Sequence, residues 1–149
     1  PCRVRNNLVI IVKLVIMYYI KLIMKNIILK LLEYIYYFSL IILFILYLYP
    51  GSLIGYFLYG NLEQQPNLIP NPMGTSINHL IFFSYITTLA LIIRSKVVNI
   101  FTEYKMILFI SFILEILHFV IPNRAFEFYD LIANILGVLI IIFIKRFIK

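Results

Sequence analysis

The chain has 149 residues, of which 64% are hydrophobic and 13% are charged, and its formal net charge is +7. Soluble domains are about half apolar and about a quarter charged, so this composition excludes an ordinary soluble globular domain. The mean hydropathy of +1.04 agrees with that exclusion. Several apolar stretches are long enough to cross a bilayer core of about 30 Å. We therefore predict an all-α, polytopic membrane helix bundle.

Charge and cysteine content exclude further classes of protein. Cys2 is the only cysteine, so neither an intrachain disulfide nor a cysteine-based metal site is expected, and we predict no cofactor. No A-x-A-like pair of small residues follows the first hydrophobic runs, which argues against a secretory signal peptide. The basic residues lie at predicted membrane boundaries rather than on one soluble face, so nucleic acid is not an expected partner.

The N-terminal segment, residues 1–33, is basic and is predicted to lie in the cytoplasm or at the membrane interface. Its apolar stretch 8–24 carries Lys13 and Lys21, each costing a few kcal/mol at the bilayer centre unless it reaches the interface. The chain begins at Pro1, whereas Met24 resembles a natural start. We expect the residues before Met24 to be an upstream extension or an interfacial helix.

Residues 34–149 are predicted to form the membrane domain, with four transmembrane helices. Pro50-Gly51 ends the first of them, and the loop chemistry of residues 51–76 separates it from the second. The four predicted helices cover residues 34–49, 78–93, 105–121 and 130–144.

The distribution of Lys and Arg predicts the topology. Of the thirteen basic residues, six precede the first span, three lie between the second and third, and three follow the fourth, which makes twelve on one side. The loops on the other side, 51–76 and 122–129, contain one basic residue, Arg124. Because Lys and Arg are enriched in cytoplasmic loops, both termini are predicted to be cytoplasmic.

Polar residues gather at the opposite, outer end of the predicted spans. Such residues are costly within a membrane and mark function by default. Residues three or four apart share one face of a helix, so the spacing predicts a single water-facing site. Its expected ligand-binding residues are His79 in the second span, Glu115 and His118 in the third, Arg124 in the next loop, and Asp130 and Asn134 in the fourth.

Several roles are open for Glu115 and His118. They form either a hydrogen-bonded pair that holds helices together or a carboxylate and imidazole that transfer protons or bind a headgroup. Together with His79 and Asp130 they also have the ligand types of a zinc or iron site, although we predict no metal.

Structural roles are also expected for other residues of this region. Arg124 is expected either to pair with Glu127 or Asp130 or to clamp an anion. Asp130 in the first turn of a helix is expected to have a structural role, and Gly137 is expected to permit close helix packing. The aromatic residues at 34–38 and at 47 and 49 are predicted to lie in interfacial belts.

The polar motifs resemble a known family. From Glu115 the chain reads Glu-Ile-Leu-His-Phe-Val-Ile-Pro-Asn-Arg, and from Asp130 it reads Asp-Leu-Ile-Ala-Asn-Ile-Leu-Gly. This resembles the VanZ-like family of small bacterial membrane proteins, which carries a Glu, a polar residue three positions on, Pro-x-Arg, and Asp-x-x-x-Asn-x-x-Gly. His79, followed by Leu-Ile-Phe-Phe, is similar to the family's His-Phe-rich second helix, and the resemblance covers about residues 50–149. Thr75-Ser76 replaces a frequent acidic-basic pair, and His118 stands where Gln is commoner.

The resemblance implies a place in the bacterial cytoplasmic membrane, and the family's founding member is linked to resistance against a glycopeptide antibiotic. A fold family does not supply a reaction, so function is argued from the site. We expect the polar pocket to bind an anionic lipid headgroup or a lipid-linked cell-wall precursor in the outer leaflet. One alternative is an intramembrane lipid-modifying enzyme with Glu115 as general base, assisted by His118 or Asp130. Another is a small assembly or transport partner whose polar cluster is only structural.

Overall fold

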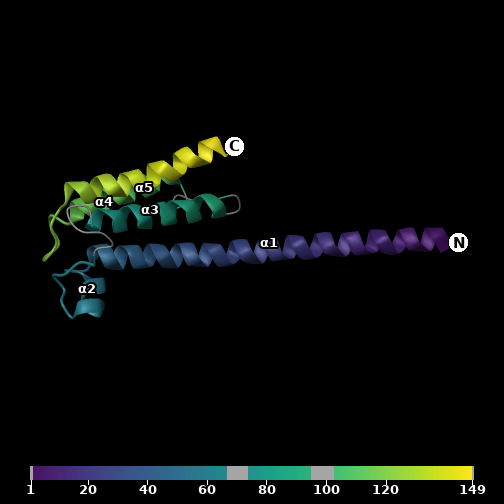
Figure 1. Cartoon of the computed structure of the whole chain (residues 1–149), viewed down its shortest axis with the longest axis horizontal. Coiled ribbons are helices and arrows are strands. Elements are labelled where there is room, and N and C mark those ends of the chain that lie inside the picture. Colours follow the sequence, from purple (N-terminus) through teal and green to yellow (C-terminus); the bar gives the residue numbers. More distant parts are fainter. Residues whose placement is uncertain (1, 67–73, 95–102, 149) are drawn as a thin grey trace.

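The computed structural model describes residues 2–66, 74–94 and 103–148, with side chains described from Lys13 onward except that of Thr75. All regular structure in these residues is helical, which confirms the predicted all-α class (Figure 1). The helices are α1 (Cys2–Leu48), α2 (Leu53–Tyr59), α3 (Gly74–Ile93), α4 (Tyr104–Leu117) and α5 (Phe128–Phe147).

Three helices among the described residues are long and apolar enough to cross a membrane. They are α1 over Lys13–Leu48, α3 over Ser76–Ile93 and α5 over Phe128–Phe147. The third predicted span, 105–121, is not confirmed, because α4 has 14 residues and is about 21 Å long at about 1.5 Å per residue. The chain leaves the helix at His118, ahead of Pro122 and of Asn123, whose φ of 58° is left-handed. Proline disfavours helical conformation in the residue before it.

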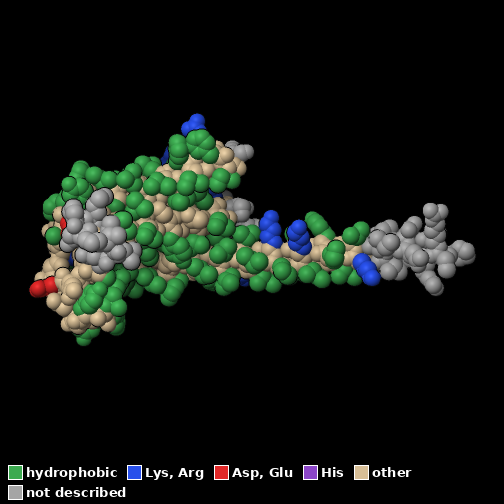
Figure 2. Space-filling view, viewed as in Figure 1, with side chains coloured by type: hydrophobic (Ala, Val, Ile, Leu, Met, Phe, Trp, Pro, Cys, Tyr) green, Lys and Arg blue, Asp and Glu red, His purple; other side chains and the backbone are tan. Residues whose placement is uncertain are grey.

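Helix α1 is continuous through the predicted boundary between residues 33 and 34. It has 47 residues and is about 70 Å long, so its N-terminal part projects beyond the other helices (Figure 1). The side chains of residues 13–28 are exposed, and lysines stand out along this otherwise apolar helix (Figure 2). An interfacial position for residues 1–33 stays a prediction.

Helices α1, α3, α4 and α5 lie side by side with alternating chain direction (Figure 1). Both termini therefore point toward one end of the bundle, and α2 and the α4–α5 connection lie at the other. All four helices contribute to the buried apolar core, and α3 and α5 form its most extensive helix pair. Representative core residues are Leu43, Phe83, Ile86, Leu114 and Val138.

The α3–α5 contact depends on Gly137. A Cβ added at this position would lie 2.6 Å from the carbonyl oxygen of Leu80 and 3.1 Å from Cβ of Phe83. The Ser84 hydroxyl donates a hydrogen bond of 3.1 Å to the Gly137 carbonyl oxygen. The predicted role of Gly137 in close helix packing is thus confirmed, since small residues let helix backbones approach.

The segment around α2 covers the end of the bundle away from the termini. Ser52 caps α2 by accepting a hydrogen bond of 2.9 Å from Gly55 N, and its own N–H donates to Leu62 O at 2.6 Å. The chain after α2 is tied to α3, because Asn78 Nδ2 donates to Pro66 O at 2.7 Å. This positions α2 and residues 61–66 beside the polar ends of the long helices.

Candidate functional site

All six predicted site residues lie at the α2 end of the bundle. Glu115 and Asn134 are fully buried, and His118 and Asp130 are each 4% exposed. These side chains face one another, as their spacing along the helices predicted. Hydrogen bonds and short ionic contacts connect the residues of α3, α4 and α5 directly. The residues in this network are His79, Glu115, His118, Asp130 and Asn134, and Arg124 shares a pocket with both histidines.

Glu115 is the branching point on α4. Its Oε1 accepts a hydrogen bond of 3.3 Å from the backbone N–H of Glu127 and lies 3.3 Å from His118 Nδ1. Its Oε2 accepts a hydrogen bond of 3.3 Å from Asn134 Nδ2 and lies 4.0 Å from His79 Nδ1. The carboxylate therefore joins α4 to α5 and approaches α3, as the structural reading of the sequence predicted.

Asp130 connects α5 to α3. Its Oδ1 accepts a hydrogen bond of 2.5 Å from the Ser76 hydroxyl, and its Oδ2 lies 3.4 Å from His79 Nε2. The carboxylate stands in the first turn of α5, where the helix dipole favours negative charge. Ser76 was not among the predicted site residues, although hydroxyl groups are frequent partners of buried carboxylates.

Tyr47 lies at the centre of the cluster, so its predicted place in an interfacial aromatic belt is wrong. It is 8% exposed, its hydroxyl is hydrogen-bonded to His79 Nδ1 at 2.6 Å, and it also lies 2.9 Å from Asn134 Oδ1. Its ring stacks on that of His118, with centroids 5.4 Å apart. Tyr36 is also fully buried, whereas Tyr34 is 64% exposed, as a belt residue would be.

Arg124 reaches from the α4–α5 connection to the end of α1. Its Nη2 donates a hydrogen bond of 2.5 Å to Leu46 O, and its Nε donates to Tyr49 O at 3.4 Å. The expected pairing with Glu127 or Asp130 is therefore replaced by capping of the last carbonyls of α1, where positive charge is favourable. Burial lowers the pKa of Arg124 from its ordinary value, yet a guanidinium stays protonated in proteins.

The described residues do not form a metal centre. No group of three His, Cys, Asp or Glu side chains among them has an arrangement that could hold a metal ion. The zinc or iron site considered for Glu115, His118, His79 and Asp130 is therefore not formed. Glu115 is also a poor candidate for a general base, because both of its oxygens already face N–H groups and it does not line the pocket.

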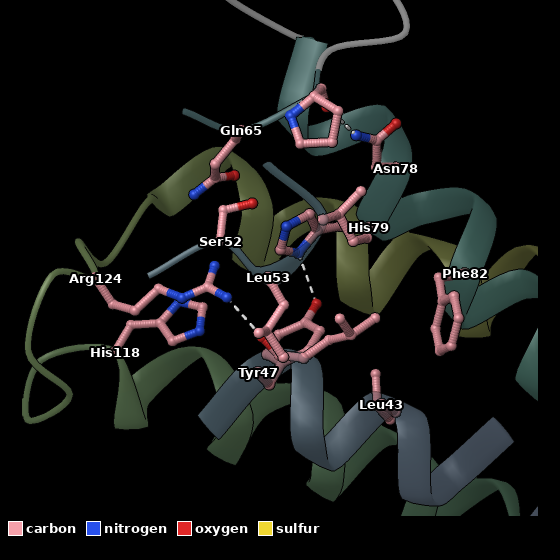
Figure 3. A pocket seen from close by; sticks show the side chains of 13 residues that line it. Leu43, Tyr47, Ser52, Leu53, Gln65, Asn78, His79, Phe82, His118 and Arg124 are labelled. Atoms are coloured by element: carbon pink, nitrogen blue, oxygen red, sulfur yellow. Dashed lines mark hydrogen bonds between the residues drawn. The ribbon is translucent and has the colours of Figure 1, made fainter. Parts of the chain in front are cut away.

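A pocket with a hollow volume of about 120 Å³ opens beside this cluster (Figure 3). Figure 3 shows Tyr47, His79, His118 and Arg124 around the same space. Polar and apolar side chains both line it, which suits an amphiphilic ligand. The polar lining residues are Ser52, Gln65, Asn78, His79, His118 and Arg124, with the hydroxyl of Tyr47; the apolar lining residues are Leu43, Leu46, Leu53, Ile54, Pro66 and Phe82.

The chain was compared with models of known protein families, with curated proteins and with solved structures, and none of the three comparisons found a match.

Proposed function

We propose that this chain is a VanZ-like, multi-pass protein of the bacterial envelope that binds an anionic lipid headgroup or a lipid-linked cell-wall precursor in this pocket. One observation carries the proposal. Arg124 is the only permanently charged residue among the thirteen described residues that line the pocket, and no lining residue is acidic. The lining therefore favours an anion beside Arg124 and apolar groups against the leucine side chains.

Arg124 has donors left for a ligand. A guanidinium has five N–H donors, and the described contacts to Leu46 O and Tyr49 O use two of them. Arginine binds phosphate or carboxylate through two parallel hydrogen bonds. The capping contacts hold the side chain in place, so an anion meets a preorganised partner and less conformational entropy is lost on binding.

The proposed topology places the pocket in the outer leaflet of the cytoplasmic membrane. Both termini lie at one end of the bundle, and twelve of the thirteen basic residues belong to that side in the sequence. By the positive-inside rule this end is cytoplasmic. In this arrangement α4 is the third of four crossings, and because it is short, the α4–α5 connection dips toward the membrane interior beside the pocket.

Native mass spectrometry of the detergent-purified protein, with identification of retained lipids, tests the proposal. We expect wild type to retain an anionic phospholipid or polyprenyl phosphate, and Arg124→Ala to lose it. Arg94→Ala is the matched control, because Arg94 is bonded to Glu103 at 2.6 Å beside the connection between α3 and α4, at the end of the bundle where the termini lie. Circular dichroism checks that both variants remain helical.

Two results would overturn the proposal. Equal retention in wild type and Arg124→Ala would show that Arg124 does not hold the anion. Retention of zwitterionic lipids alone would show that the pocket does not select charge. Either result favours the alternative that the polar cluster only holds the helices together, as in an assembly or transport partner.

A further inference from the structure

His118 has an unused nitrogen at the pocket. Among the described buried side-chain nitrogen and oxygen atoms, His118 Nε2 is the one without a hydrogen-bond partner. The side chain is 4% exposed and lines the pocket together with Arg124. Buried polar atoms in native proteins are nearly always paired, and an unpaired one costs free energy. The atom therefore points to a partner that is supplied by a ligand.

The surroundings of His118 determine which kind of partner fits. Glu115 accepts hydrogen bonds at both oxygens, from Glu127 N and from Asn134 Nδ2, so it acts as a carboxylate acceptor toward His118 Nδ1, 3.3 Å away. We assign the hydrogen to Nδ1 of a neutral His118, because the carboxylate oxygen that faces Nδ1 is an acceptor. In a neutral imidazole one nitrogen donates and the other accepts, which leaves Nε2 as an acceptor. The missing partner is a hydrogen-bond donor.

We propose that His118 Nε2 accepts a hydrogen bond from a hydroxyl group of the ligand while Arg124 binds its phosphate. This deepens, and rests on, the headgroup binding proposed above. The ligand class is then a phosphate ester with a free hydroxyl, either on a glycerol headgroup or as the P–OH of a phosphomonoester. A single water molecule needs about 10 to 15 Å³ of such volume, so the pocket of about 120 Å³ has room for several groups of the size of a hydroxyl.

Glu115 and Tyr47 are positioning residues in this arrangement. Glu115 fixes the tautomer of His118 through Nδ1. The Tyr47 ring is stacked on the imidazole with an interplanar angle of 19° and restricts its rotation. Carboxylates commonly orient histidines in this way at functional sites, so that the second nitrogen faces the ligand.

The test compares two anionic lipids that differ in the hydroxyl group. Phosphatidylglycerol and phosphatidylmethanol with the same acyl chains are both phosphodiesters with one negative charge, and only the first has free hydroxyls in its headgroup. We expect native mass spectrometry of the wild-type full chain to show about tenfold tighter binding of phosphatidylglycerol, since one hydrogen bond of ordinary strength corresponds to about a factor of ten. Phosphatidic acid tests whether the P–OH of a phosphomonoester can serve as the donor. Glycerol phosphate tests whether the ligand is a soluble phosphate ester rather than a lipid.

Variants at residue 118 assign the preference to the imidazole nitrogen. His118→Phe keeps a ring against Tyr47 but removes Nε2, and we expect it to bind both lipids equally. His118→Gln keeps an acceptor oxygen and should restore part of the preference. Preference for phosphatidylglycerol or phosphatidic acid over phosphatidylmethanol supports a lipid ligand. Binding of glycerol phosphate by a protein that binds none of the three lipids, with loss of that binding in His118→Phe, supports a soluble phosphate ester.

The outcomes separate this inference from the proposed function. If wild type binds phosphatidylmethanol as tightly as the lipids with hydroxyls, or if His118→Phe keeps the preference, the role of His118 is refuted while anion binding at Arg124 stands. If wild type binds none of these anionic probes, both proposals fail. The wild-type comparison needs no variant, so a folding defect of His118→Phe cannot hide the answer.

Discussion

Tyr47→Phe removes one hydroxyl from the centre of the polar cluster and leaves the ring in place. The hydroxyl lies 2.6 Å from His79 Nδ1 and 2.9 Å from Asn134 Oδ1. Hydrogen bonds between membrane helices contribute about 0.6 kcal/mol on average and about 1.7 kcal/mol at most. Because the substitution removes both hydrogen bonds and leaves His79 Nδ1 and Asn134 Oδ1 to pair with each other across 3.2 Å, we expect the free energy of unfolding to fall by about 1 to 3 kcal/mol.

Unfolding in mixed micelles of detergent and increasing dodecyl sulfate, followed by circular dichroism, measures this change. Tyr34→Phe is the matched control, because Tyr34 lies on the same helix and is 64% exposed. Its effect should stay within about 0.5 kcal/mol, as is usual for surface substitutions. If the two variants were equally stable, the Tyr47 hydroxyl would not belong to the buried network and the interfacial-belt reading would be restored.

Three further changes test the packing and electrostatics of the same region. Gly137→Ala places a methyl group 2.6 Å from Leu80 O and should destabilise the bundle by about 1 to 3 kcal/mol in the same unfolding assay, as overpacking does. Asn134→Asp puts a second carboxyl group where Asn134 Nδ2 now donates to Glu115 Oε2 at 3.3 Å. Because two neighbouring carboxylates repel each other, we expect lower thermal stability near neutral pH and recovery on acidification. An unchanged melting profile would contradict this expectation. The pKa of Glu127 is raised above its ordinary 4.5 by burial and by two neighbouring carboxyl groups, so the folded state binds its proton more tightly than the unfolded state. The resulting stabilisation is present at low pH and is lost as the pH rises through the raised value; Glu127→Gln should flatten this part of the stability profile.

Much of the candidate site could be predicted from spacing. Glu115 and His118 are three residues apart and Asp130 and Asn134 are four apart, and residues at these distances share a helix face. Polar groups on membrane helices face the bundle interior or a water-filled cavity, so their convergence is expected for an apolar helix bundle. The place of Arg124 in the short connection predicted that it lies at the same end. Its contact with the α1 carbonyls was not predicted.

Tyr47 could not be assigned from sequence. Aromatic residues near the end of an apolar segment are typical of interfacial belts, and the same pattern results when one of them turns inward to a polar cluster. Only the packing of α1 against α3 and α4 distinguishes the buried Tyr47 from the exposed Tyr34. Its stacking on His118 joins residues that are far apart in the chain, a relation that carries no local signal.

The lengths of α1 and α4 were misjudged for opposite reasons. No Gly or Pro interrupts residues 2–48, and lysines are good helix formers, so the charges that argued for a separate N-terminal segment do not break the helix. In α4 the apolar run continues through Phe119 and Val120, which suggested a longer span. Both side chains are exposed in the turn after the helix, where Pro122 prevents continuation.

The short α4 explains why some residues of the candidate site also hold the fold together. In the proposed four-span topology the α4–α5 connection dips toward the membrane interior, where backbone groups that leave a helix must find partners within the protein. Arg124 donates to the last carbonyls of α1, and Glu115 accepts from the Glu127 N–H ahead of α5. Removing either side chain would therefore alter folding as well as binding. His118 Nε2 is different, because no described backbone or side-chain group depends on it, so the lipid preference of the wild type reports its role in recognition without any change in the fold.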